Sequence, residues 1–303
     1  DVLQCILGPF IASLERGLSR VPGARTISVD SVGKGTYVEE ALYFCDNGLE
    51  VDFTAWDSTV SPFDLKLTHH VYKSLFGEQG SSFFCQALAE HSTSKWSYRD
   101  GCRYTLRGTR VSGDSDTTVG NTIIHWCYNV AFLSDPDNEL YPANVAHFHF
   151  EVSGDDGVLG LPRPTYNLDF FSRCGKHCKP IRRPCVDDIS FCSGAVLPVT
   201  IDGQDCFRHY RAPGRVLSRL PYASRPVHPR HAASELEARA LCEIYSTSGC
   251  PIIHGYALLL HKSAVLASGP SIRTDRDVQR RLDLEKSVPL MPGVLMRTRE
   301  RFA

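Results

Sequence analysis

Two pairs of aspartates in this chain have the residue type and spacing needed to bind a divalent metal ion. Asp155 and Asp156 follow Gly154, while Asp52 and Asp57 stand earlier in the sequence. Adjacent carboxylates repel each other, so a turn that carries them requires compensation by positive charge. Mg²⁺ supplies such charge, because hard cations bind carboxylate oxygens together with substrate phosphates. Taken alone, each pair has a structural alternative, since Asp also favours turns and helix N-termini.

A polar segment between the two pairs could bind phosphate or ribose. Residues 112–116 (Ser-Gly-Asp-Ser-Asp) run directly into an apolar stretch that begins at Thr117. A loop that leads into a helix N-terminus presents backbone amides to phosphate oxygens. Thr117 and Asn121 are four residues apart, so on a helix both side chains lie on one face and could bind one ligand. The alternative is that Ser, Asp and Thr cap the helix and that Asn121 faces solvent.

Hydrophobic periodicity predicts the elements that must position these residues. Helical spacing of apolar residues predicts helices over 6–20, 64–76, 117–133 and 251–266. Alternation predicts strands over 49–53, within 100–111 and over 145–152, the last with Phe148, Phe150 and Val152 on one face. Residues 157–161 are the expected partner of that last strand, so Gly154-Asp155-Asp156 forms the connection of a β-hairpin.

The composition changes beyond residue 200. Arg, His and Pro concentrate in 208–231, which predicts a long irregular connection. Ser234-Glu-Leu-Glu237 is a capping-box pattern, and it predicts a helix that begins there and ends near Gly249. The expected plan is therefore a mixed α+β part followed by a helical C-terminal part.

Composition and cysteine usage limit the function classes. A formal net charge of −1 argues against a protein whose whole surface coats nucleic acid, so any such contact must come from local patches. Apolar and charged contents are typical of a soluble globular protein, and no apolar run approaches the roughly 18 residues of a membrane-spanning helix. The 12 cysteines come without a secretory signal and are expected to be reduced thiols.

One cluster of cysteines and histidine suggests a second kind of site. Cys174, His177, Cys178, Cys185 and Cys192 follow one another closely. Structural zinc sites use four such ligands. The spacings match no known zinc motif, so buried thiols are the favoured interpretation.

The order of these motifs resembles that of the RNA-dependent RNA polymerases of positive-strand RNA viruses, in particular the tombusvirus-like and nodavirus-like enzymes. Asp52-Phe-Thr-Ala-Trp-Asp57 is similar to the first palm motif of that family, Ser112-Gly113 with Thr117 and Asn121 to the second, and Gly154-Asp155-Asp156 to the third. Gly175-Lys-His-Cys-Lys179-Pro180 is similar to the fourth, and Ile189-Ser-Phe-Cys192-Ser193-Gly194 to the fifth. The resemblance covers roughly residues 50–195.

The resemblance implies a fold and a function. The fold is an α+β right-hand polymerase, with an antiparallel-sheet palm flanked by helices, partial fingers and a helical thumb. Residues 1–51 are the expected partial fingers, 52–202 the palm with a fingers insertion at about 61–104, and 203–303 the thumb. The implied function is template-directed RNA synthesis, which replicates a viral RNA genome by two-metal nucleotidyl transfer.

The resemblance also assigns roles at the metal site. Asp52 and Asp155 are the implied ligands of two Mg²⁺ ions, or of Mn²⁺, with Asp156 in support and the backbone carbonyl of Phe53 as a further ligand. Lys179 is the candidate general acid that protonates the leaving pyrophosphate, and Lys176 of the same motif is its rival.

A second group of residues is implied to bind the incoming nucleotide. Asp57 and Asn121, with Ser112 or Thr117 and the loop residue Gly113, would contact the ribose 2′-hydroxyl. A site built to bond that hydroxyl discriminates against deoxyribose, because its polar groups are otherwise left unpaired. Asp57 together with Asn121 therefore argues against a reverse transcriptase.

The implied partners are the RNA template, nascent RNA and ribonucleoside triphosphates. Other viral replication proteins and host membranes would be contacted through regions outside this chain, in membrane-associated replication complexes of the host cytoplasm. The family carries a basic motif upstream of the first palm motif, and no Lys/Arg cluster of that kind precedes Asp52, so the protein is expected to continue upstream of Asp1. The alternative function is a non-enzymatic RNA-binding or zinc-organised interaction module, based on residues 174–192 and 208–231.

Overall fold

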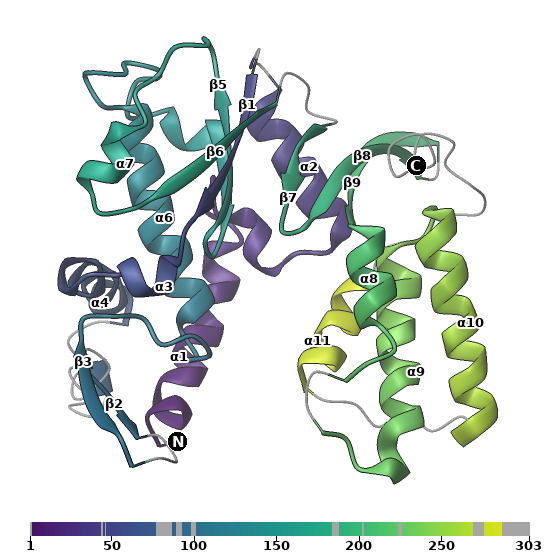
Figure 1. The fold of residues 1–303 in the computed structure, drawn as a ribbon. Helices are drawn as coiled ribbons and strands as arrows, with labels where there is room; N and C mark the ends of the chain where they lie inside the picture. Colours follow the sequence, from purple (N-terminus) through teal and green to yellow (C-terminus); the bar gives the residue numbers. More distant parts are fainter. Residues whose placement is uncertain are drawn as a thin grey trace. The chain divides into compact units, whose positions relative to one another are not determined.

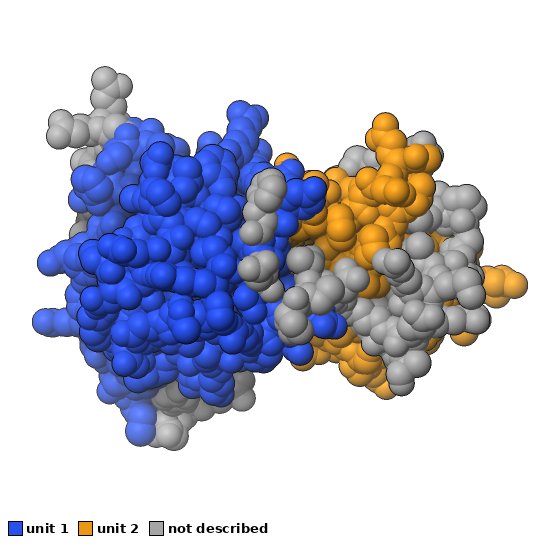
Figure 2. All heavy atoms as spheres, turned by 90° about the horizontal axis from the view of Figure 1, so that it is seen from above, with its two compact units in different colours: residues 1–28, 40–189 blue, residues 29–39, 190–303 orange. Residues whose placement is uncertain are grey.

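The chain divides into two compact units, which are described separately. The computed structural model describes residues 2–43, 45, 47–76, 87–88, 93–97, 101–183, 188–201, 203–223, 226–268 and 276–286. Unit 1 consists of residues 1–28 and 40–189, and unit 2 of residues 29–39 and 190–303 (Figure 2). Helix α2 (Ser31–Leu42) contributes residues to both units. The assignment of fingers, palm and thumb to residue ranges stays a prediction.

A four-stranded antiparallel sheet forms the centre of unit 1. Its strands are β1 (Asn47–Phe53), β4 (Phe150–Ser153), β5 (Asp156–Leu161) and β6 (Cys178–Arg183), in the order β4-β5-β1-β6. Figure 1 labels β1, β5 and β6 of this sheet. The β4–β5 hairpin thus lies beside β1, as the sequence predicted. Val51 of β1 is opposite Gly157 of β5, and Asp52 is opposite Lys179 of β6. This register brings the end of β1 next to the hairpin connection.

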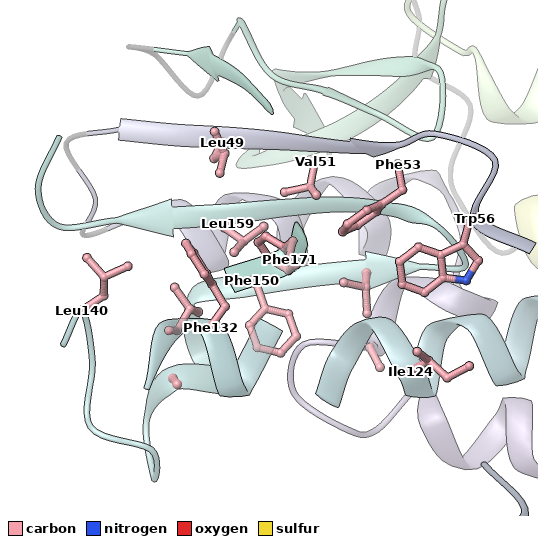
Figure 3. Packing of buried hydrophobic residues seen from close by; sticks show 14 of the residues in the cluster. Leu49, Val51, Phe53, Trp56, Ile124, Phe132, Leu140, Phe150, Leu159 and Phe171 are labelled. Atoms are coloured by element: carbon pink, nitrogen blue, oxygen red, sulfur yellow. The ribbon is translucent and has the colours of Figure 1, made fainter. Parts of the chain in front are cut away.

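Helix α6 (Thr117–Leu133) packs against this sheet and provides much of the core of unit 1. The helix has the bounds that its apolar periodicity predicted. Aromatic side chains fill the space between sheet and helices, and α7 (Asp169–Arg173) adds Phe171 to them (Figure 3). Phe53 packs edge-on against Trp56 and Phe171, with ring centroids 4.6 and 5.5 Å apart. The core therefore fixes the end of β1 and the start of α3 (Trp56–Thr59) together.

The predicted strand 145–152 is correct only in its second half. Residues Ala146–His149 form a 3₁₀ helix, η2, and strand β4 begins at Phe150. The reason is local hydrogen bonding, since the carbonyl of Pro142 accepts from the N–H groups of Val145 and Ala146. Those N–H groups are therefore not available to a strand ladder.

The remaining elements of unit 1 form a second core around the N-terminal helix. Helix α1 (Val2–Leu18) packs against α4 (Pro62–Phe76) and α6 through Leu7, Ile11 and Tyr72. Further elements are η1 (Arg25–Ser28), β2 (Thr93–Ser97) and β3 (Arg103–Arg107). The expected helices over 6–20 and 64–76 are confirmed, with α1 and α4 each beginning earlier than predicted.

Unit 2 combines a three-stranded antiparallel sheet with a group of helices. The strands are β7 (Ser190–Phe191), β8 (Gly194–Ile201) and β9 (Gln204–Arg211), in that order. The helices are α8 (Pro213–Arg219), α9 (Pro229–Ser246), α10 (Pro251–Ser268) and α11 (Arg276–Glu285). Apolar side chains from β8, α9 and α10 form its core. No helix in the described part of the chain is long and apolar enough to span a membrane.

Two predictions for unit 2 are wrong. Residues 208–231 are not a long irregular connection, because β9 pairs with β8 along its whole length and α8 follows. Helix α9 does not begin at the capping box, and Ser234 is buried inside it. The helix begins at Pro229, and Nδ1 of His228 caps it by accepting a hydrogen bond from the N–H of Arg230 at 3.2 Å. Proline at the first helical position favours this start, because its missing N–H would be unsatisfied there in any case.

Candidate active site

Asp52 and Asp155 lie close together at one end of the central sheet. Asp52 is the exposed residue near the end of the otherwise buried strand β1. Gly154 and Asp155 connect β4 to β5, and Ser153 pairs with Asp156. Gly154 has φ +69°, in the left-handed region that glycine adopts without strain. Two distant parts of the sequence thereby lie close together, and their role as a metal site stays a prediction.

The electrostatics of Asp155 show that carboxylates converge there. Partial burial raises the pKa of Asp155, and the negative charges of Asp57 and Asp52 raise it further, against the effect of a backbone hydrogen bond. A cation between these groups would relieve the repulsion. The arrangement therefore has the charge that a metal site requires.

The donor set fits a hard cation that brings further ligands with it. Among the described residues, no three His, Cys, Asp or Glu side chains are grouped closely enough to hold an ion. Mg²⁺ is usually bound by one or two carboxylates, waters and substrate phosphates rather than by a complete protein cage. Asp52 and Asp155 match that pattern. Asp156 is exposed at the start of β5, and the side chain of Phe53 is buried in the core, so only its backbone could contribute.

Asp57 lies at the centre of a hydrogen-bonded cluster that joins three segments. Its Oδ1 accepts from Nδ2 of Asn121 at 2.7 Å, and its Oδ2 accepts from the hydroxyl of Ser112. Its backbone carbonyl accepts from the N–H of Arg110 at 3.2 Å. The side-chain oxygen of Asn121 is buried and has no partner among the described residues. An orphan acceptor beside a carboxylate is an arrangement that a ligand hydroxyl would satisfy.

The loop before α6 has its own internal support. Gly113 is exposed with φ +98°, and the hydroxyl of Thr117 donates to the carbonyls of Val111 (2.9 Å) and Asp114 (3.0 Å). Thr117 therefore shapes the loop, whereas Ser112 and Asn121 contact Asp57. The predicted contact of Thr117 with a nucleotide stays a prediction.

A buried ion pair beneath this loop was missed by the sequence reasoning. Arg110 and Asp116 are both buried and paired, and the hydroxyl of Tyr72 donates to Oδ2 of Asp116 at 3.1 Å. The guanidinium of Arg110 lies against Gly120, where any side chain would collide with it. The signal in the sequence was an arginine and an aspartate that flank the loop, but both also suit an exposed loop.

The two candidate lysines occupy different environments. Lys176 is fully buried, pairs with Asp64 at 3.0 Å and donates to the carbonyl of Thr59 at 2.9 Å. Its ammonium also lies 4.7 Å from the ring centroid of Trp56. Lys176 therefore holds α3 and α4 in place. Lys179 is exposed on β6 and directly opposite Asp52, which favours it as the candidate proton donor.

Two residues of α6 hold the hairpin connection, and neither was predicted. The N–H of Gly154 donates to Oγ1 of Thr122 at 2.8 Å, and the carbonyl of Gly154 lies 3.2 Å from Nδ1 of His125. Burial lowers the pKa of His125 to about 3, so the ring is neutral and the tautomer with Nδ1–H donates this bond. Thr122 and His125 thus fix both backbone groups of the residue before Asp155. We refer to this arrangement as the α6 clamp.

The short distance between His125 of the α6 clamp and the backbone of β5 explains why residue 157 is a glycine. A Cβ at Gly157 would lie 2.5 Å from Cε1 of His125. In the sequence, Thr122 and His125 stand three residues apart on an apolar helix, and no role was predicted for either of them. The pairing with Gly154 depends on the tertiary fold and has no local signature.

The described residues form no zinc cluster. Cys174 and Cys178 belong to unit 1 and Cys192 to unit 2, while Cys185 lies outside the described residues. Cys192 and Ser193 form the connection between β7 and β8 with φ of 48° and 57°. The fifth motif is therefore a tight hairpin, and the zinc-organised alternative has no support in the described structure.

Comparisons with known proteins agree with the family resemblance. Residues 47–279 match the family model described as viral RNA-dependent RNA polymerase. The chain is 24% identical over 230 residues to a putative RNA-directed RNA polymerase of Barley yellow dwarf virus (isolate PAV), covering 73% of this chain and 25% of that protein. It is also 24% identical over 213 residues to the RNA-directed RNA polymerase of Tobacco necrosis virus (strain D), covering 63% and 27%. The chain therefore spans about a quarter of the length of these curated relatives.

A solved structure shares the fold. The RNA-dependent RNA polymerase of a human picobirnavirus superposes with a TM-score of 0.65 at 15% sequence identity. The match covers 88% of this chain and 50% of that one. At this level of identity the likeness concerns the fold, and it agrees with the predicted α+β polymerase architecture.

Proposed function

Because this chain belongs to the family of viral RNA-dependent RNA polymerases, we propose that it is the catalytic part of an enzyme that copies an RNA template into RNA. The observation that carries this proposal is the convergence of Asp52, Asp155 and Asp57. We infer that two of these carboxylates bind metal ions; the third is hydrogen-bonded to Asn121, which supports a role in ribose binding.

We propose that Asp52 and Asp155 hold two Mg²⁺ ions, with support from Asp156 and the backbone carbonyl of Phe53, and that Mn²⁺ can replace them. When bound, such ions activate the primer 3′-hydroxyl and stabilise the charge of the leaving pyrophosphate. The protein contributes rigid placement, because Asp52 is on a central strand and Asp155 follows a residue held by the α6 clamp. Accurate placement of reacting groups supplies a large part of enzymatic rate enhancement.

The Asp57–Asn121–Ser112 cluster is proposed to select ribonucleotides. A ribose 2′-hydroxyl can donate to Asp57 or to the orphan oxygen of Asn121. A deoxyribose offers no such donor and leaves these groups unpaired, which disfavours its binding. Asn121→Ala should therefore reduce the preference for ribonucleotides over deoxyribonucleotides, and unchanged selectivity would contradict the assignment.

Lys179 is proposed to protonate the leaving pyrophosphate. Its side chain is exposed and projects from the strand position opposite Asp52. A donor in this position lies on the strand next to Asp52, which would hold the metal ion that accompanies the triphosphate. General acid catalysis of this kind contributes about 10²–10⁴-fold in rate.

A primer-extension assay on an RNA template tests the proposal. The chain, and in parallel the chain extended upstream of Asp1, should incorporate ribonucleotides in a Mg²⁺-dependent reaction. Asp155→Ala should abolish synthesis, whereas Asp169→Ala, which removes an exposed acid on α7, should leave it unchanged. Absence of synthesis by the extended protein, or full activity of Asp155→Ala, would refute the proposal.

The proposed partners are the RNA template, nascent RNA and ribonucleoside triphosphates. Other viral replication proteins and host membranes are proposed to be contacted through regions outside this chain, in replication complexes of the host cytoplasm. Flotation of the longer protein with host membranes tests this, and a protein that stays entirely with the cytosolic fraction contradicts it.

A further inference from the structure

The buried ion pair of Arg110 and Asp116 joins the two ends of the loop 111–115. The exposed fraction of the side chain is 0% for Arg110 and 1% for Asp116. Nη1 of Arg110 donates to Oδ2 of Asp116, and the hydroxyl of Tyr72 donates to the same oxygen at 3.1 Å. Tyr72 belongs to the core around α1, where it is buried. Both ends of the loop are therefore anchored to the interior of unit 1.

The stability of the fold does not by itself explain this ion pair. Nε and Nη2 of Arg110 are buried and have no partner among the described residues. Asp116 is at the N-cap position of α6, where an aspartate usually accepts from the N–H groups of the first turn, but its carboxylate makes no such bond within the described part of the chain. A buried ion pair with unbonded donors adds little stability compared with apolar side chains of similar size. A positional role accounts for the pair better than a stabilising one.

Arg110 is connected to Asp57 through its backbone and through its charge. The N–H of Arg110 donates to the backbone carbonyl of Asp57 at 3.2 Å. Two residues further along the chain, the hydroxyl of Ser112 donates to Oδ2 of Asp57. Burial lowers the pKa of Arg110, but the negative charge of Asp116, and more weakly that of Asp57, raises it above its ordinary value. Arg110 is therefore charged, and its position decides where the chain places Ser112 relative to Asp57.

The middle of the loop has little support of its own. Gly113 has φ +98°, and a Cβ at this position would have no atom within 4 Å. Within the loop, the N–H of Asp114 donates to the carbonyl of Val111 at 3.1 Å. A short segment with open space at its centre depends on its ends for a fixed conformation. The ion pair supplies that anchorage.

We propose that the Arg110–Asp116 ion pair is a positioning element that holds Ser112 against Asp57 and thereby sets the preference for ribonucleotides. The inference rests on the proposed role of Asp57, Asn121 and Ser112 in ribose binding. It adds two positioning residues that act on the nucleotide only through this cluster. When the pair is removed, the ends of the loop are no longer tied together, and Ser112 is held less firmly at Asp57. A polar site discriminates between substrates only as far as its groups are held in place.

Four variants of the chain, extended upstream of Asp1, separate this role from a general effect on folding. Arg110→Met/Asp116→Asn removes both charges together, and the asparagine keeps an acceptor for the hydroxyl of Tyr72. Tyr72→Phe removes only that hydroxyl, and it tests the same anchorage if the double variant does not fold. Arg110→Lys is the conservative variant, because it retains the positive charge. The matched control is Arg173→Gln, which removes an arginine of α7 that is 56% exposed and 3.8 Å from Asp135. Thermal unfolding verifies that each variant is folded.

Amide hydrogen exchange measures the anchorage of the loop directly. The N–H groups of Asp114 and Thr117 donate to carbonyls within the loop, each at 3.1 Å. In the double variant their exchange should be about tenfold faster or more, because the loop opens more often. Tyr72→Phe should change it in the same direction and to a smaller extent. Arg173→Gln should exchange as the unmodified protein does.

Primer extension with a ribonucleotide or a deoxyribonucleotide measures the selectivity. The ratio of the two kcat/KM values should fall about tenfold or more in the double variant, mainly through a higher KM for the ribonucleotide. Arg110→Lys should retain the ratio of the unmodified protein. A purely structural role of the ion pair would lower kcat/KM for both nucleotides alike.

Three results would overturn the proposal. They are unchanged exchange of the loop amides in the double variant and in Tyr72→Phe, a constant selectivity ratio, and equal losses of kcat/KM for the two nucleotides. Failure of the proposed polymerase function would appear instead as absence of synthesis by the unmodified extended protein. In that case hydrogen exchange still decides whether the ion pair holds the loop.

Discussion

Replacement of Thr122 by valine removes one half of the α6 clamp without changing the size of the side chain. The hydroxyl of Thr122 accepts the N–H of Gly154 at 2.8 Å and donates to the carbonyl of Thr118 at 2.7 Å. Thr122 is fully buried, so water cannot replace the lost partner of Gly154. We expect Thr122→Val to lower the free energy of unfolding by about 1–3 kcal/mol, the usual cost of an unsatisfied buried polar group.

The effect of Thr122→Val on activity should exceed its effect on stability. The N–H of Gly154 can regain a partner only if the connection between β4 and β5 moves, and Asp155 moves with it. Misplacement of a reacting group by about 1 Å can cost roughly 10²-fold in rate. In single-nucleotide primer extension we therefore expect kcat to fall by about 10- to 100-fold, with little change in KM for the nucleotide, because the Asp57–Asn121 cluster is untouched.

Thr122→Ser is the matched control. It keeps the hydroxyl and removes one buried methyl group, which costs about 1 kcal/mol of stability. Urea unfolding should give both variants a similar loss of stability, while only Thr122→Val loses kcat. Equal kcat values for the two variants would refute the role of the clamp, as would a loss of activity in Thr122→Val that its unfolded fraction fully explains.

Three further predictions follow from buried groups of unit 1. Burial raises the pKa of Glu151 from 4.5 to about 7. The stability that the protonated Glu151 carboxyl contributes is therefore complete below its unfolded pKa and is lost as the pH rises toward 7. Glu151→Gln should flatten this pH dependence in thermal unfolding, and an unaltered pH profile would contradict the prediction. Gly157→Ala should destabilise the protein by about 1–3 kcal/mol, because the added methyl group collides with His125. The double variant Gly157→Ala/His125→Ala should recover part of this loss of stability. Additive losses of stability would argue against the contact. Lys176→Met should cost about 3–5 kcal/mol of stability, because it removes the counter-charge of the buried Asp64. Lys179→Met should instead lower activity and leave unfolding unchanged, and the reverse pattern would exchange the roles of the two lysines.

Elements with a strong, uninterrupted periodicity of apolar residues could be predicted from the sequence. Helix α6 has the predicted bounds, because an uninterrupted apolar pattern and a polar loop mark its start. Strand β1 and the connection between β4 and β5 were also predicted, since alternation and a glycine at the connection identify them, although β4 begins later than predicted. The order of Asp52, Asn121 and Asp155 predicts that they belong to one site, and their role in that site stays a prediction.

Features that depend on partners distant in the sequence could not be predicted. Strand β9 forms because β8 offers a complete ladder, although the Arg, His and Pro content of 208–231 predicted an irregular connection that would include its second half. Nothing local in the sequence predicts the burial of Lys176 or Arg110, and each is buried because the fold supplies a carboxylate, Asp64 or Asp116. The α6 clamp likewise pairs side chains with backbone groups that only the tertiary structure brings together.

The convergence of Asp52 and Asp155 on shared metal ions is tested most directly by a metal-binding measurement. Mn²⁺ binding can be followed by electron paramagnetic resonance in the presence of a non-hydrolysable ribonucleoside triphosphate. The unmodified chain should bind Mn²⁺ with the nucleotide, Mg²⁺ should compete, and Asp52→Asn and Asp155→Asn should each abolish most of this binding. Variants that bind Mn²⁺ and nucleotide as tightly as the unmodified chain would contradict a shared metal site at these two carboxylates.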